Sequence, residues 1–344
     1  MPGTCSDPSS PPSVERQGLS LQPILEPIRA DLETVEARMM AAAGETYEPL
    51  SSALQSLLAS GGKRLRPALV VLSARLHEWD PAPVVSLAAA VEMLHTATLI
   101  HDDTIDGAPV RRGQRTLNAT WRPAATILAG DFLFARAAAL AAETGNTRVA
   151  SIFANTLMTI CQGELQQMLS LRDWRGPHSD YYARIYAKTA SLFAASCEAG
   201  AVLGKAPEGH IEQLREYGRL LGLAFQIIDD VLDFTGDEGS LGKRVGSDLR
   251  QGIATLPIHH YLKTGGDPVL VEAALQRNGA DATDREQAVE KLLSLVLASP
   301  AIASCRREAR DLARQARASI SSLAAGPYQE SLCNLADVVA ARSV

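Results

Sequence analysis

The sequence predicts an all-α protein on three observations. From about residue 20 onward, Ala and Leu recur at three- and four-residue spacings, as in LQPILEPIRADLETVEARMMAAA. Alternating β-branched runs, which would indicate strands, are nearly absent. Gly and Pro interrupt the helical pattern at several points along the chain, and no repeat of fixed period is present. We therefore expect roughly a dozen helices joined by short loops.

The expected interruptions can be given in chain order. They are Gly61 and Gly62, Pro81, the GAPVRRGQR segment from Gly107, Gly145, the RGPHS segment from Arg175, Pro207, Gly236 to Gly246, and Gly265 with Gly266. No linker is long enough to separate two domains, so residues 19–344 are expected to form one helical domain. The opening MPGTCSDPSSPPSVERQG is rich in Pro and Ser, which predicts a disordered tail over residues 1–18.

Composition excludes several classes of protein. A net charge of −6 over 344 residues gives no sign of nucleic-acid binding. The five cysteines are widely spread and never form a CxxC pair, which argues against disulfides or a zinc site and favours a reducing cytoplasm. The beginning of the chain lacks the basic and apolar regions of a signal peptide. Glu92 and Arg136 interrupt the most apolar stretches, so no transmembrane segment is expected.

The most informative stretch is HTATLIHDDTIDGAPVRRG, from His95 to Gly113. On a helix, Asp102 and Asp106 lie four residues apart on one face, with His95 two turns earlier and Asp103 about 100° away. Like charges at that spacing raise one another's pKa and favour a bound cation. A hard divalent ion such as Mg²⁺ would bridge these carboxylates to phosphate oxygens. Taken alone, the motif also fits a solvated acidic helix end.

A second acidic motif changes that balance. GLAFQIIDDVLDFTGD, from Gly222, places Asp229 and Asp233 four residues apart, with Asp230 beside them and Gln226 one turn earlier. Apolar residues flank these acids, so the helix is not simply solvated. Two acidic faces on helices that are partly buried predict a shared metal cluster.

Cationic residues occur near both motifs. GGKRLRP places Lys63, Arg64 and Arg66 next to Pro67, which favours a helix start where backbone donors and side chains together could hold a diphosphate. The others are Arg111, Arg112, Lys188 beside Thr189 in YAKTASLF, and Lys243. Because GxxxxGK[ST], GxGxxG, HExxH and GxSxG are absent, the phosphate is not expected to sit in a nucleotide fold. The cations instead suit two diphosphates flanking a metal cluster.

These motifs, in this order, resemble the trans-isoprenyl diphosphate synthases, the polyprenyl synthetase family. The resemblance rests on GGKRLRP, HTATLIHDDTIDGAPVRRG, ICQGELQQM, YAKTASLF, FQIIDDVLD, LGKRVGSDLRQGIATLP and the final LCNLADVVAARSV, and covers nearly the whole chain beyond the predicted tail. It implies a single helical bundle around a deep central cavity, commonly a homodimer. It also implies an Mg²⁺-dependent condensation of isopentenyl diphosphate with an allylic diphosphate.

The resemblance also implies a role for individual residues. Asp102, Asp106 and Asp229 would bind Mg²⁺ directly, with Asp103, Asp230 and Asp233 as further acids around it. Isopentenyl diphosphate would be held by Lys63, Arg66, His95 and Arg112, and the allylic diphosphate by Arg111, Lys188, Thr189, Gln226 and Lys243. Ionisation of the allylic carbon–oxygen bond would give a carbocation that the second substrate attacks. The departed diphosphate would take the proton, so no protein base is needed.

Product length depends on residues near the first motif. Short-chain members carry an aromatic residue four or five positions before the first Asp, whereas this chain has Thr98 and Ala97 there. Thr98 lies one turn from Asp102 on the same helix face, while the role of Ala97 rests on the resemblance alone. DDTID lacks the two-residue insertion of many bacterial farnesyl synthases, and GIATLP has Ile253 where many members have Lys. These features favour a product longer than geranylgeranyl. Candidates for the cavity floor are Phe153, Leu157 and Met158.

Three alternatives remain at this point. A short-chain farnesyl or geranylgeranyl synthase would share every motif except the chain-length positions. A terpene cyclase shares the fold but replaces the second acidic motif and lacks GGKxxR, and both features are present here. A non-catalytic subunit of a heteromeric synthase would show decayed acidic motifs, whereas both are intact.

Overall fold

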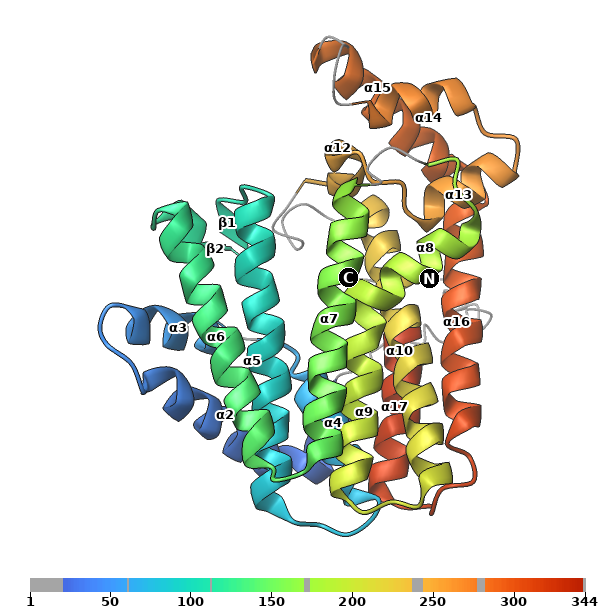
Figure 1. The fold of residues 1–344 in the computed structure, drawn as a ribbon. Helices are drawn as coiled ribbons and strands as arrows, with labels where there is room; N and C mark the ends of the chain where they lie inside the picture. Colours follow the sequence, from blue (N-terminus) through green and yellow to red (C-terminus); the bar gives the residue numbers. More distant parts are fainter. Residues whose placement is uncertain are drawn as a thin grey trace, which may run out of the picture.

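In a computed structural model, the chain folds into a bundle of helices (Figure 1). The structure describes residues 21–60, 62–111, 113–169, 174–236, 244–276 and 282–342. Within these ranges the only strands are two residues long and pair as a small antiparallel ribbon. The all-α prediction is therefore confirmed. The tail predicted over residues 1–18 lies outside the described residues.

The elements have the following bounds. The first half contains α1 (Leu21–Leu25), the 3-10 turn η1 (Glu26–Ile28), α2 (Arg29–Gly44), α3 (Leu50–Ala59), α4 (Leu65–Arg75), α5 (Pro81–Ile105), β1 (Val110–Arg111), β2 (Gln114–Arg115), the 3-10 turn η2 (Leu117–Ala119) and α6 (Pro123–Glu143). The second half contains α7 (Thr147–Leu169), α8 (His178–Ile185), the π-helical turn η3 (Tyr186–Ala190), α9 (Ser191–Leu203), α10 (Glu208–Thr235), α12 (Ser247–Gln251), α13 (Leu256–Lys263), α14 (Pro268–Leu275), α15 (Ala282–Ala298), α16 (Ala301–Ser319) and α17 (Pro327–Ala341).

Gly and Pro set most of the helix boundaries where the sequence predicted them. Pro81 begins α5, where the side chain of Asp80 caps the helix by accepting from the amide of Ala82. Gly145 has a positive φ between α6 and α7, and Pro207 immediately precedes α10. The GAPVRRGQR segment forms the β1–β2 ribbon, which the sequence analysis treated only as an interruption.

The long helices run side by side and carry the main core (Figure 1). Helix α5 packs against α4 and α6, and α10 packs against α9 and α16. A second cluster of buried apolar residues joins α12 to α15, the shorter helices at the top of Figure 1. The two aspartate motifs thus lie on α5 and α10, helices whose remaining faces are buried in the bundle.

Helices α5 and α6 are long and apolar enough to cross a membrane by length and composition alone, and so is the bent pair α15–α16 if it counts as one segment. Glu92 and Arg136, which were expected to interrupt these stretches, therefore do not shorten them below the length of a membrane span. In α5, however, 72% of the apolar window is buried inside the protein, where it forms core. Its Glu92 is also buried and forms an ion pair with Arg64 at 3.1 Å. The corresponding window of α6 is 39% buried.

Candidate active site

The first aspartate motif forms the end of α5. The helix ends at Ile105, and the amide of Asp106 still donates to the carbonyl of Asp102 at 2.8 Å, so the four-residue spacing is kept. Asp103 is buried and accepts a hydrogen bond from Nε of Arg111 at 2.7 Å. Burial is the main cause that raises the pKa of Asp102 to about 6, and the nearby Glu164 and Asp106 raise it further. A cation bound at this position would favour the ionised form of Asp102.

Lys188 is the charged neighbour that most strongly lowers the pKa of Asp102. Its Nζ contacts Oε1 of Glu164 on α7 at 2.7 Å. Burial lowers the pKa of Lys188, but the charges of Asp102, Glu164 and Asp106 outweigh that effect and raise it overall. Lys188 is therefore a firmly charged ammonium group beside the first motif.

The residue after Lys188 connects this region to the second motif. The hydroxyl of Thr189 donates to Oε1 of Gln226 at 2.6 Å, and Nε2 of Gln226 donates to Oδ1 of Asp230 at 2.8 Å. The hydroxyl of Tyr181 donates to the other oxygen of Asp230 at 2.8 Å. Complete burial and the nearby Asp248 nevertheless raise the pKa of Asp230 to about 7. Lys188 and Thr189 therefore join the two acidic motifs through adjacent side chains.

The backbone that carries Lys188 and Thr189 is a π-helical turn, η3, between α8 and α9. Such turns are rare and often occur at functional sites. Two glycines let the neighbouring helices approach this turn closely. A Cβ at Gly163 of α7 would lie 2.4 Å from the Cβ of Ala187, and a Cβ at Gly222 of α10 would lie 2.5 Å from the Cα of Ala190. Both glycines lie within the sequence motifs, but their spacing gives no sign of this role. Their close approach fixes η3 between α7 and α10.

The second motif also positions the chain that follows it. Oδ2 of Asp233 accepts from the amide of Asp248 at 3.2 Å, and its carbonyl accepts from the amide of Gly246 at 2.7 Å. Gly246 adopts a positive φ that favours glycine. Asp233 therefore anchors the start of α12, in addition to the role implied for it near the metal.

Arg342, just beyond α17, also reaches the second motif. Its guanidinium contacts Oδ1 of Asp229 at 3.0 Å and lies over the ring of Phe225, 4.9 Å from the centroid. Nothing in the sequence pairs these positions, because they are 113 residues apart. The sequence reasoning missed Arg342, although it lies in the quoted LCNLADVVAARSV segment.

The residues predicted to bind the two diphosphates have different surroundings. His95 and Arg111 line a small cavity of about 50 Å³ together with Arg64 and Asp103. Arg64 donates to Glu92 of α5, to Glu36 of α2 and to the carbonyl of Leu58 in α3, so it links three helices.

The remaining residues of this predicted set are exposed, covered by an aromatic ring, or not described. Lys63 is exposed, and the guanidinium of Arg66 lies 5.0 Å from the centroid of the Phe193 ring. Arg112 and Lys243 lie outside the described residues.

A larger cavity, of about 470 Å³, opens beside the second motif. Its wall includes Tyr181, whose hydroxyl holds Asp230, and Arg184, which donates to the carbonyl of Ala254. Ile253 also lines it. The residue that replaces the Lys of many family members therefore faces this cavity, whose walls come from α7, α8 and the segment between α12 and α13.

The chain-length residues differ in their surroundings. Ala97 is fully buried in the main core, whereas Thr98 is partly exposed and donates to the carbonyl of His95 at 2.7 Å. Among the floor candidates, Phe153 is buried, whereas Met158 is 56% exposed. The three floor candidates stay predictions.

The acids fit a hard divalent cation such as Mg²⁺. Among the described residues, Asp102, Asp106 and Asp229 do not bring their oxygens within 4.8 Å of one another. Mg²⁺ does not require that, because it keeps several waters and is bound by one or two carboxylates together with substrate phosphates. Burial is the main cause that raises the pKa of Asp102 and of Asp230, so a cation bound nearby would favour the ionised carboxylates. Residues from both motifs could therefore hold the ion.

The fold and site together define an all-α protein with two aspartate motifs joined by a lysine–threonine pair. Residues 47–292 match the family model described as Polyprenyl synthetase. The chain is 32% identical to octaprenyl diphosphate synthase of Haemophilus influenzae, over 92% of this chain and 96% of the relative. It is 44% identical to heptaprenyl diphosphate synthase component 2 of Geobacillus stearothermophilus, over 67% of this chain and 72% of the relative.

A solved structure agrees with these sequence relatives. The polyprenyl synthase of Caulobacter crescentus, complexed with calcium and isoprenyl diphosphate, superposes with a TM-score of 0.87 at 37% identity, covering 96% of this chain and all of the other. The chain belongs to the polyprenyl synthetase family, as the motifs indicated.

Proposed function

We propose that the protein is a prenyltransferase that condenses isopentenyl diphosphate with an allylic diphosphate to make a trans-polyprenyl diphosphate longer than geranylgeranyl. The observation that carries the proposal is the position of η3 between the two motifs: the charge of Lys188 acts on Asp102, and the next residue, Thr189, is hydrogen-bonded through Gln226 to Asp230. This position suits one diphosphate held between two acidic motifs. Mg²⁺, when bound, would neutralise the diphosphate and favour its departure.

The protein's own groups would act by binding and charge stabilisation. Lys188 and Arg111 are cations placed beside the first motif, where they can take negative charge from a leaving diphosphate. His95 and Arg111 line the small cavity, which suits an approach of isopentenyl diphosphate from that side. Both motifs lie on helices whose other faces are buried in the bundle, which would limit the access of water to the carbocation.

Two observations support a long product. Thr98 leaves the wall next to Asp102 free of an aromatic ring, and the relatives named above are heptaprenyl and octaprenyl diphosphate synthases. The short-chain alternative keeps every other feature of the site. The test is to incubate purified protein with labelled isopentenyl diphosphate, Mg²⁺ and, separately, dimethylallyl, geranyl or farnesyl diphosphate. Products no longer than geranylgeranyl from all three primers would refute the long-chain proposal.

A homodimer is the proposed assembly. Apolar side chains are exposed on α6, where Ile127 and Leu128 are 45% and 66% exposed, and on α7, where Met158, Leu165 and Met168 are 48 to 57% exposed. Exposed apolar residues on neighbouring helices are typical of an interface. Sedimentation of the wild type should give a dimer, and Leu128→Asp should shift it toward monomer. A monomeric wild type at micromolar concentration would contradict this assembly.

The relative called component 2 raises the alternative that the chain is one part of a heteromeric synthase. Both aspartate motifs are intact here, which favours the catalytic part over a non-catalytic one. The activity of the purified chain alone distinguishes a self-sufficient enzyme from one part of a heteromeric synthase, because a component that needs a partner would be inactive by itself. The cytoplasmic location expected from the sequence stays a prediction.

A further inference from the structure

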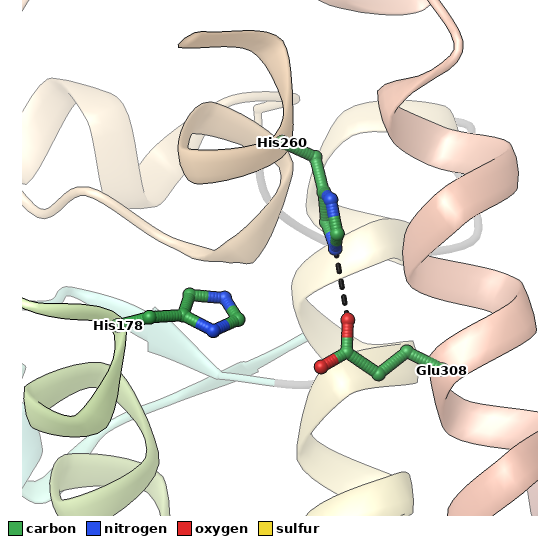
Figure 2. A group of neighbouring side chains, drawn as sticks. All are labelled: His178, His260 and Glu308. Carbon is green, nitrogen blue, oxygen red and sulfur yellow. Dashed lines mark hydrogen bonds and ion pairs between the residues drawn. The ribbon is translucent and has the colours of Figure 1, made fainter. Parts of the chain in front are cut away.

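A group of three potential metal ligands lies outside both aspartate motifs. His178 begins α8, His260 lies on α13 and Glu308 lies on α16. Each offers one ligand atom, and the three atoms lie within 4.8 Å of one another. Figure 2 shows the ring of His178 facing the pair formed by His260 and Glu308. Among the described residues this is the only group of His, Cys, Asp or Glu that meets this spacing.

From this geometry we propose that His178, His260 and Glu308 bind a zinc-class transition-metal ion, separate from the Mg²⁺ expected at the aspartate motifs. Two imidazoles and one carboxylate form a ligand set that suits Zn²⁺, leaving a fourth position for water. Mg²⁺ prefers oxygen ligands and would be disfavoured here. The cysteine pattern could not reveal such a site, because no cysteine is among the ligands.

The distances permit coordination with small movements. Tetrahedral ligands at about 2.0 to 2.2 Å from zinc lie about 3.3 Å apart. Nε2 of His260 and Oε2 of Glu308 are 2.9 Å apart, so they must separate by a few tenths of an ångström. The most distant pair in the group must approach by no more than about 1.5 Å. Rotation of half-buried side chains provides movements of that size.

The surroundings of the three residues also suit a bound cation. Nε2 of His178 is buried and has no hydrogen-bond partner among the described residues, so this ring is not committed to a protein contact. Burial lowers the pKa of His178, which keeps the ring neutral with a lone pair available. The hydroxyl of Tyr182 donates to Oε1 of Glu308, the kind of outer contact that orients a metal-binding carboxylate. The side chains of His260 and Glu308 are 17% and 29% exposed, which gives an ion access from solvent.

A metal here would fasten three helices around the candidate active site. The ring of His178 stacks on that of Tyr181 at 6.2 Å, and Tyr181 holds Asp230. Fixing α8 to α13 and α16 would therefore steady the wall of the larger cavity, which Tyr181 lines. The proposed metal would stabilise the structure and take no part in the reaction, so Zn²⁺ binding can be measured without a turnover assay.

The experiment uses the full chain freed of metal by a chelator and then kept in excess Mg²⁺, so that the aspartate motifs are occupied. Zn²⁺ is titrated in competition with a coloured chelator, and Co²⁺ is added separately as a spectroscopic probe. We expect one equivalent of Zn²⁺ per chain, the intense visible bands of tetrahedral Co²⁺, and a Zn²⁺-dependent rise in unfolding temperature. His178→Gln and Glu308→Gln should each weaken Zn²⁺ binding about 100-fold or more, because even outer contacts of a metal site are worth 10- to 100-fold.

His259→Gln is the matched control, since His259 precedes His260 on α13 and its ring lies 5.7 Å from that of His178 without belonging to the group. This variant should bind Zn²⁺ like the wild type. Retention of the Zn²⁺ site in both ligand variants, its loss in His259→Gln, or only the weak bands of octahedral Co²⁺ would overturn the proposal. Circular dichroism of each variant shows that loss of binding is not loss of fold.

Discussion

Replacing Asp230 by Asn tests how strongly the second motif opposes its own ionisation when no metal is bound. Asp230 is 3% exposed, and burial together with Asp248 raises its pKa to about 7 from an ordinary 3.8. Each unit of pKa difference between the folded and unfolded states is worth about 1.4 kcal/mol. Ionisation of Asp230 in the folded protein therefore costs at most about 4 kcal/mol of stability.

The sign follows from where the proton is bound. Below about pH 4 the carboxyl is protonated in both states and costs nothing. Between about pH 4 and 7 the unfolded chain loses the proton while the folded chain keeps it, so stability falls as pH rises. Above about pH 7 both states are ionised and the full cost remains. Asn at this position has no proton to lose, so the variant should gain stability relative to wild type across this interval.

The assay is urea unfolding of both proteins in a chelator, at several pH values from 4 to 8. Asn weakens the hydrogen bonds from Tyr181 and Gln226, which adds an offset of about 1 kcal/mol that does not depend on pH. The informative quantity is therefore the difference in free energy of unfolding between the two proteins. We expect this difference to change by about 2 to 4 kcal/mol between pH 4 and 8. The exposed Asp284→Asn variant serves as a control and should give a difference that hardly changes. Parallel stability curves for wild type and Asp230→Asn would refute the reasoning.

Other predictions concern turnover and product. Asp102→Ala and Asp229→Ala should each reduce turnover by roughly a thousandfold or more with an unchanged circular dichroism spectrum; near wild-type rates at saturating Mg²⁺ would contradict their assignment. Lys63→Ala should mainly raise the KM for isopentenyl diphosphate and Lys188→Ala that for the allylic substrate, each by roughly 10- to 100-fold. Equal effects on both substrates would show that this partition is wrong. Thr98→Phe should shorten the products seen by mass analysis at about 1 to 3 kcal/mol of stability, whereas unchanged length would show that the growing chain does not pass Thr98.

Local sequence patterns predicted the elements of the fold well. The four-residue spacing of Asp102 and Asp106 and the prolines at helix starts act within one or two turns, so they can be read without knowledge of packing. The π-helical turn could not be read in this way. It depends on the close approach of Gly163 to Ala187, two residues brought together only when α7 packs against η3. The ribbon after α5 escaped notice because its two-residue strands are too short for a periodic pattern.

The site itself shows why some partners of the acids could not be predicted. Without metal or substrate, three acids in this region are neutralised from within the chain: Asp103 by Arg111, Glu164 by Lys188, and Asp229 by Arg342. Arg111 and Lys188 are also proposed to bind diphosphate.

A cation that donates to a carboxylate has fewer donors left for a phosphate, because both accept from the same N–H groups. Binding of a diphosphate together with its metal would therefore exchange partners. The aspartates would hold the metal, and Arg111 and Lys188 would turn donors toward the phosphate oxygens. The sequence motifs indicate only the metal and diphosphate partners. The ion pairs within the chain are seen only in the structure.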